Sequence, residues 1–241
     1  MKKYLLFAAL AGTFTISGCS VPSMALESSF KQEAEELPIE GRKFLRPNKD
    51  FSIGSYQVTD IKRGWKRSSG FSIFVYENIA SGQQYELSVE DAAGQRWNIY
   101  TAANLHEKSI NFDGWEFDVA PNTEYYASYF TSPESNAWRF ITADPGHYLA
   151  RKDFKGELTN GSMTFVVKPV YRFQDHKMPV SDIVGYEFLL GDEAQAAVQV
   201  LNGGKVWMKP ELSKDLKMVF ASASASLLLY EKLKDQASSV E

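Results

Sequence analysis

Cysteine is nearly missing from this chain, since Cys19 is the only one among 241 residues. A disulfide framework is therefore excluded, and no set of thiolates is available to hold zinc. Histidine is also scarce, and His106, His147 and His176 do not stand at metal-ligand spacing from one another. We therefore expect no metal site, no cofactor and a fold that is stabilised by its hydrophobic core alone.

The motifs of common catalytic and nucleotide-binding sites are missing as well. The sequence contains no G-x-S-x-G, no P-loop and no G-x-G-x-x-G. Asp144 lies three residues before His147, and Asp175 directly precedes His176. An envelope hydrolase in which one of these histidines activates a serine is thus a minor alternative, and we expect no catalytic residue. The net charge of −4 also argues against nucleic acid as a partner.

The first nineteen residues have the layout of an export signal. Two lysines stand near the start, an apolar stretch covers residues 4–16, and small residues precede Cys19. The apolar stretch is shorter than the ~20 residues that cross a bilayer as a helix. The segment Ile16-Ser17-Gly18-Cys19 resembles the lipobox that ends the signal peptide of bacterial lipoproteins.

This resemblance implies a location. In bacterial lipoproteins the cysteine thiol takes a diacylglycerol, the signal (here residues 1–18) is removed, and the new amino terminus is acylated, for example with palmitate. Ser20 stands where an aspartate would favour the inner membrane, so the resemblance implies a lipid anchor in the outer membrane, facing the periplasm. Loss of Lys2 and Lys3 with the signal leaves a net charge of −6, so attachment depends on the acyl chains.

The rest of the chain divides into a tether and a body. Residues 19–40 combine five glutamates with Pro22 and Pro38, which predicts a flexible tether. Residues 41–241 are expected to form one β-rich domain. Two parts divided near Gln174–Asp182 are the alternative, because that stretch holds few apolar residues.

A hydrophobic period of two begins near Phe51 and predicts half-buried antiparallel strands. The predicted strands cover residues 56–61, 71–76, 85–89, 96–101, 115–119, 124–131, 137–142, 163–173, 185–190, 196–200 and 206–208. Turn residues separate them, as at Asp91–Gly94 and Asn202–Gly204. The predicted fold class is mainly β (α+β), as an antiparallel β-sandwich or an open barrel.

One helix is predicted, over Ser213–Lys234, with Ser213 as its N-cap. Its middle, Ala221–Ser226, alternates alanine and serine, and such small side chains allow close packing on a sheet. A membrane-spanning helix is excluded because the uncharged run Met218–Tyr230 is too short.

Two segments are candidate binding surfaces. Lys62, Arg63, Trp65, Lys66 and Arg67 form a basic loop that is expected to face an anionic surface. The alternative is a solvated hairpin loop with the tryptophan packed inward.

The second candidate is an aromatic sheet face at Tyr126 and Phe130, which would serve a carbohydrate- or peptide-binding module. A two-sided core under the C-terminal helix explains the same residues. The leading hypothesis is a non-catalytic cell-envelope lipoprotein that binds a protein or a cell-wall polymer, and the carbohydrate- or peptide-binding module is its alternative.

Overall fold

The computed structural model describes residues 22–43, 46–64, 82–104, 109–112, 115–118, 123–146 and 148–231. The expected signal, residues 1–18, and the residues Cys19 and Ser20 lie outside the described residues. So do the predicted strand 71–76 and the loop residues Trp65, Lys66 and Arg67.

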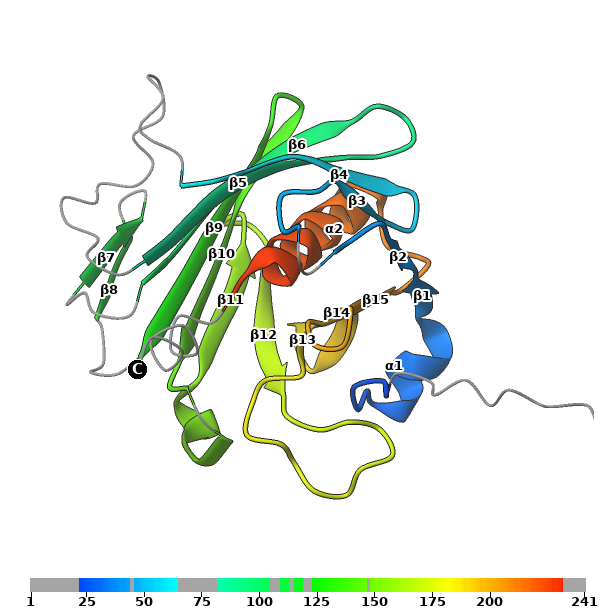
Figure 1. Ribbon diagram of the computed structural model, residues 1–241, viewed down its shortest axis with the longest axis vertical. Helices are drawn as coiled ribbons and strands as arrows, with labels where there is room; N and C mark the ends of the chain where they lie inside the picture. The colour runs from blue at the N-terminus through cyan, green and yellow to red at the C-terminus, as the bar shows by residue number, and fades with distance from the viewer. Residues whose placement is uncertain are drawn as a thin grey trace, which may run out of the picture.

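Thirteen of the described strands form one antiparallel sheet in which nearly every strand pairs with its neighbour in sequence. They are β1 (Glu35–Leu37), β2 (Ile39–Glu40), β3 (Phe51–Ile53), β4 (Tyr56–Arg63), β5 (Gly82–Glu90), β6 (Arg96–Asn104), β9 (Glu124–Ser132), β10 (Ser135–Asp144), β11 (Lys155–Thr159), β12 (Thr164–Val170), β13 (Gly185–Leu190), β14 (Glu193–Gln199) and β15 (Lys205–Met208). A separate hairpin of β7 (Ser109–Phe112) and β8 (Trp115–Asp118) stands apart from it (Figure 1). The predicted mainly β fold class is confirmed, in its barrel form.

One short segment joins the two ends of this sheet. β1 pairs with β15, whereas β2 pairs with β3 at the other end, and only Pro38 separates β1 from β2. The sheet therefore forms a nearly closed barrel. Proline lacks the N–H that a ladder requires, so it suits the point where the segment changes partner. Its carbonyl still accepts a hydrogen bond of 2.8 Å from the Gly54 N–H.

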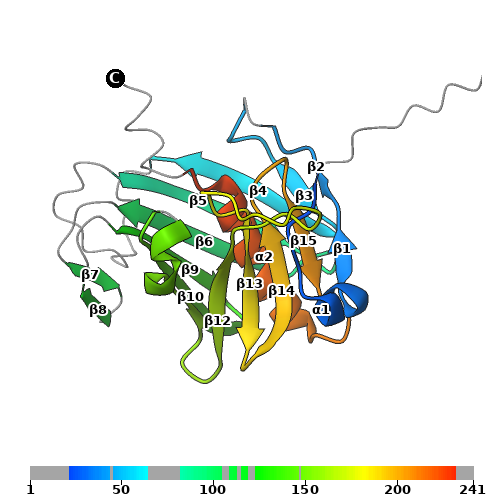
Figure 2. The same ribbon diagram turned by 90° about the horizontal axis from the view of Figure 1, so that it is seen from below.

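The helix α2 (Lys214–Leu229) lies inside the curve of the sheet, as both views show (Figure 1, Figure 2). Every residue from Met218 to Leu229 is buried, so the helix is covered on all sides rather than along one stripe. The Ala–Ser run makes this possible because it adds little volume. Phe220 contributes the largest side chain, with ring centroids 4.9 Å from Phe165 and 5.4 Å from Phe188.

The sequence predicts the start of α2 correctly but not its end. The Ser213 side chain accepts a hydrogen bond from the Leu216 N–H, as expected for an N-cap. The helix ends at Leu229 rather than Lys234, because Tyr230 is already extended, with φ −71° and ψ 132°.

The predicted tether is wrong for its described part, residues 22–40. Met24 and Phe30 are buried, and Phe30 belongs to the short helix α1 (Ser28–Glu33). The Met24 N–H donates to the side-chain oxygen of Gln199 at 2.8 Å. Gly185 leaves room for this segment, because a Cβ there would overlap the Met24 sulfur. The folded body thus includes residues that were assigned to the tether, and β1 and β2 complete its barrel.

The sheet is continuous on both sides of the segment Gln174–Asp182, since β12 pairs with β13 across it. The described strands give no boundary between two separate sheets there. Residues 148–153 form a 3-10 helix between β10 and β11.

Candidate functional site

A cavity of about 400 Å³ lies where α2 ends. This volume falls within the ~300–1,000 Å³ range of small-molecule sites. Four parts of the chain contribute to its wall, namely residues 42–51, Arg63 on β4, residues 182–201 and residues 227–231.

The inner wall of the cavity is apolar. Leu227, Leu228 and Leu229 come from the last turn of α2 and are at most 4% exposed. The other apolar side chains of the wall are Phe51, Ile183, Val200 and Leu201, with Pro47 nearer the surface. The buried ring of Tyr186 and the half-buried ring of Tyr230 complete this wall.

The last carbonyls of α2 are bound by side chains from three other elements. The Tyr85 hydroxyl on β5 donates to the Ser226 carbonyl at 2.6 Å. Arg42, just after β2, donates to the Leu228 carbonyl and to the Gly203 carbonyl, the latter at 2.9 Å. Arg63 at the end of β4 donates to the Leu229 carbonyl at 2.8 Å. These donors satisfy carbonyl groups that have no partner within the helix, and the guanidinium groups of Arg42 and Arg63 stand at the negative end of the helix dipole.

Burial acts on the titrating groups around this helix end. It raises the pKa of the Tyr85 hydroxyl and lowers the pKa of the Arg42 guanidinium. Burial, together with the nearby Glu124 carboxylate, also raises the pKa of Tyr230. The Tyr230 hydroxyl donates to this carboxylate, which is itself buried on β9. Tyr230 is therefore held in place as a neutral side chain between the core and the cavity.

The rim of the cavity is basic. Five cationic side chains line it, against the carboxylates of Asp182 and Glu231. Lys43, Arg46 and Lys49 are exposed, and their side chains make no hydrogen bond or ion pair with the described residues. The cavity therefore carries an excess of positive charge, although the whole chain has a net charge of −4.

The predicted basic loop is only partly described, and its two described cations bind the protein itself. Arg63 holds the end of α2 and lies 3.5 Å from a Glu231 carboxylate oxygen. Lys62 pairs with Glu86 on β5 at 2.9 Å, and this hydrogen bond raises the pKa of Lys62. Neighbouring acids and carbonyls thus engage both residues, and the expectation that the loop faces an external anionic surface stays a prediction, since Trp65, Lys66 and Arg67 lie outside the described residues.

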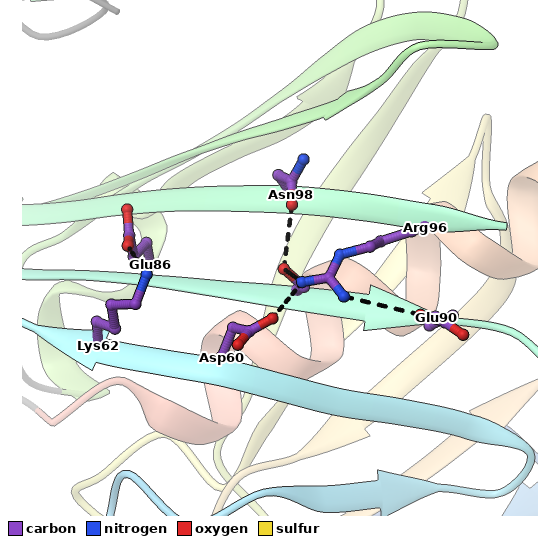
Figure 3. A network of polar contacts seen from close by, with 7 residues as sticks. Asp60, Lys62, Glu86, Glu90, Arg96 and Asn98 are labelled. Atoms are coloured by element: carbon purple, nitrogen blue, oxygen red, sulfur yellow. Dashed lines mark hydrogen bonds and ion pairs between the residues drawn. The ribbon is translucent and has the colours of Figure 1, made fainter. Parts of the chain in front are cut away.

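Lys62 belongs to a polar network on the outer surface of β4, β5 and β6 (Figure 3). Asp60 sits at an irregularity of β4 with a positive φ of 54° and pairs with Arg96. Arg96 also donates to the Ser88 hydroxyl at 2.8 Å, and this hydroxyl donates to Asn98 at 3.0 Å. Charges of both signs alternate here, so the network leaves little net charge for a ligand.

The predicted aromatic binding face is wrong for the two residues assigned to it. Tyr126 is 1% exposed and Phe130 is fully buried. The Tyr126 ring packs against Phe140 and Tyr230, with centroids 5.3 and 4.9 Å apart. Alternation along β9 points both predicted residues into the barrel, where α2 and the neighbouring strands cover them. They belong to the core and offer no platform to a carbohydrate or peptide.

The histidines give no catalytic arrangement among the described residues. His176 is exposed, its ring lies 5.9 Å from that of Phe173, and its side chain makes no hydrogen bond to a described serine or acid. His106 and His147 lie outside the described residues. No group of three or more metal-ligating side chains occurs within the part of the chain that the structure describes.

The sequence contains a signal for the basic rim that the analysis of motifs did not single out. Residues 42–49 carry four cations, but Phe44, Leu45 and Pro47 interrupt them. The cations of this segment are therefore less closely spaced than those of Lys62–Arg67, where four lie within six residues. Only the fold brings it to the end of α2.

Comparison with protein families, curated proteins and solved structures found no match to this chain. None of the described helices has the length and apolar character needed to cross a bilayer. The fold and the site thus define a nearly closed antiparallel barrel with a central helix, and with an apolar cavity under a basic rim.

Proposed function

We propose that this protein is a non-catalytic, lipid-anchored binding protein of the cell envelope, and that it binds an anionic partner at the basic cavity. The observation that carries the binding site is the group of Lys43, Arg46 and Lys49, which have no acidic partner among the described residues. A pocket of small-molecule size with a few convergent polar groups is the usual form of a binding site.

Binding is favoured over catalysis by what surrounds the cavity. Its charged residues are mainly lysine and arginine, and a general base would have to come from Asp182 or Glu231, both exposed. Neither a histidine nor a serine is among the described residues that line it. The part of this wall that the structure describes can attract and hold an anion, but it offers no nucleophile paired with a base.

The lipid anchor is proposed from the lipobox resemblance at Cys19, and fractionation of cells tests it. The wild-type protein is expected in the outer-membrane fraction. The Cys19→Ala variant is expected to keep its signal and to lack bound palmitate. A Cys19→Ala protein that is cleaved and fractionates like wild type would overturn the anchor.

The binding site is tested separately in cells. A photo-crosslinking amino acid at Leu201, which lines the cavity, should capture a partner from the envelope. The triple variant Lys43→Gln, Arg46→Gln, Lys49→Gln should lose this product. A matched triple variant at exposed lysines outside the cavity, Lys152→Gln, Lys177→Gln, Lys214→Gln, should retain it. Equal capture by both variants would contradict an anionic partner at the rim.

A further inference from the structure

The cationic rim is larger than the fold requires. Arg42 and Arg63 satisfy the last carbonyls of α2, so the helix end accounts for these two cations. The field of a helix end weakens within its last turn. Lys43, Arg46 and Lys49 donate no side-chain hydrogen bond to α2 or to another described residue. Their presence at the cavity is therefore not explained by the stability of the helix.

The wall beneath this rim has the opposite character. Among the described residues, seven aliphatic or aromatic hydrocarbon side chains form it. Val200 and Leu201 are half-buried, and the other five are at most 4% exposed. A polar anion such as free phosphate would leave the accessible part of this wall, at Val200 and Leu201, in contact with water. A neutral apolar ligand would leave the cations without a partner. Only a molecule that has both an apolar chain and an anionic group matches both parts of the cavity.

We infer that the cavity binds a single-chain anionic amphiphile, with its hydrocarbon chain against Leu201 and Leu227–Leu229 and its anionic group among Lys43, Arg46 and Lys49. The inference rests on the proposed binding function, since it assigns the ligand class of the same cavity, but it does not depend on the lipid anchor. The anionic group is a carboxylate or a phosphate ester, both of which lysine and arginine bind by charge-assisted hydrogen bonds.

Isothermal titration calorimetry tests this assignment. The full chain with Cys19→Ala is used, so that its own acyl chains do not occupy the cavity. The probes are dodecanoate and dodecyl phosphate, both below their micelle concentrations. We expect one molecule bound per chain. Dodecyl phosphate bound tighter than dodecanoate indicates a phospholipid-like headgroup, and the reverse order indicates a fatty acid.

Two kinds of variant separate the charged part from the apolar part. The triple variant at Lys43, Arg46 and Lys49 should weaken binding at least tenfold, since it removes the three cations that face the anionic group. The matched triple variant at Lys152, Lys177 and Lys214 should change it less than twofold. Leu201→Trp should also weaken binding, because the larger side chain occupies cavity volume. Thermal unfolding of each variant verifies that it is folded.

Several results would overturn the inference. The first is that neither anionic probe binds saturably. The second is that neutral dodecyl maltoside or inorganic phosphate binds as tightly as the anionic amphiphiles. The third is that a folded rim variant keeps the affinity of the wild type. The test is distinct from that of the proposed function. If crosslinking in cells depends on the rim cations while neither amphiphile binds, the proposed function stands and the amphiphile assignment fails.

Discussion

Arg63 is the residue whose replacement best tests how the barrel holds its central helix. Its guanidinium reaches from the end of β4 to the Leu229 carbonyl at 2.8 Å and lies 3.5 Å from Glu231. Its side chain is only 21% exposed. Arg63→Gln would remove the charge at the negative end of the helix and leave a shielded carbonyl without its donor.

The expected cost follows from these contacts. A hydrogen bond to a charged group contributes about 1.5–3 kcal/mol, and this range already includes most of the interaction with the helix dipole. For a chain of this size, each kcal/mol lowers the melting temperature by roughly 2–4 °C. We therefore expect Arg63→Gln to melt roughly 3–12 °C below wild type. Lys62→Gln should melt close to wild type, because its side chain is 67% exposed and pairs at the surface.

Thermal and urea unfolding, followed by circular dichroism, measure the difference. Arg63→Lys keeps the charge but loses the planar fork, so its stability should fall between those of wild type and Arg63→Gln. If Arg63→Gln and Lys62→Gln melt at the same temperature, the guanidinium does not hold the helix end. The prediction that Arg63 faces an external anionic surface would then gain support.

Two further predictions concern the core and the response to pH. Phe220→Ala should lower the free energy of unfolding by about 3–5 kcal/mol, because its ring is fully buried in an aromatic cluster. Leu149→Ala replaces a side chain that is 84% exposed and should leave the free energy of unfolding nearly unchanged. A similar loss of stability in both variants would contradict the placement of α2. Burial, assisted by the nearby Glu27 carboxylate, raises the pKa of Glu187 above 4.5, so the folded state binds this proton more tightly than the unfolded chain. The stability of the wild-type protein should therefore decline as the pH rises above 4.5, and the urea midpoint of Glu187→Gln should decline less than that of the wild type. A difference in midpoint between the two proteins that does not vary with pH would refute this.

Strands such as β4, β5 and β10 were predictable because the barrel buries mainly one face of each. On β5, Tyr85, Leu87 and Val89 are at most 2% exposed and point inward, and the alternation of polar and apolar residues predicts this directly. The turn at Gly94 was equally clear, and its φ of 84° is the conformation that glycine adopts most easily. Local pattern and final burial agree wherever one side of a strand faces the core.

The closing strands could not be predicted in the same way. β1 and β2 consist of Glu-Glu-Leu-Pro-Ile-Glu, which has the composition of a solvated linker. Only Leu37 and Ile39 pack on the core. The pairing with β15 joins residues 169 to 173 positions apart, and the pairing with β3 joins residues 12 or 14 positions apart. Such pairing is decided by the closure of the whole barrel, so no local pattern announces it.

The candidate site was missed for a related reason. Sequence reasoning ranks charged segments by density, whereas a binding site depends on which charges remain unpaired after folding. Lys62 and Arg63 lie in the denser segment but are engaged by Glu86 and by the end of α2. The cations of the less dense segment, such as Arg46, have no such partner among the described residues.

Closure of the barrel and formation of the cavity are coupled through a single stretch of chain. β2 completes the sheet, and the residues that follow it supply Arg42 to the helix end and Lys43 to the rim. The rim cations therefore converge only when the closing segment is paired and α2 is in place. The unfolded chain lacks this arrangement, so an anion bound at the rim must stabilise the closed barrel by mass action. Binding at the cavity and closure of the barrel are thus expected to reinforce each other.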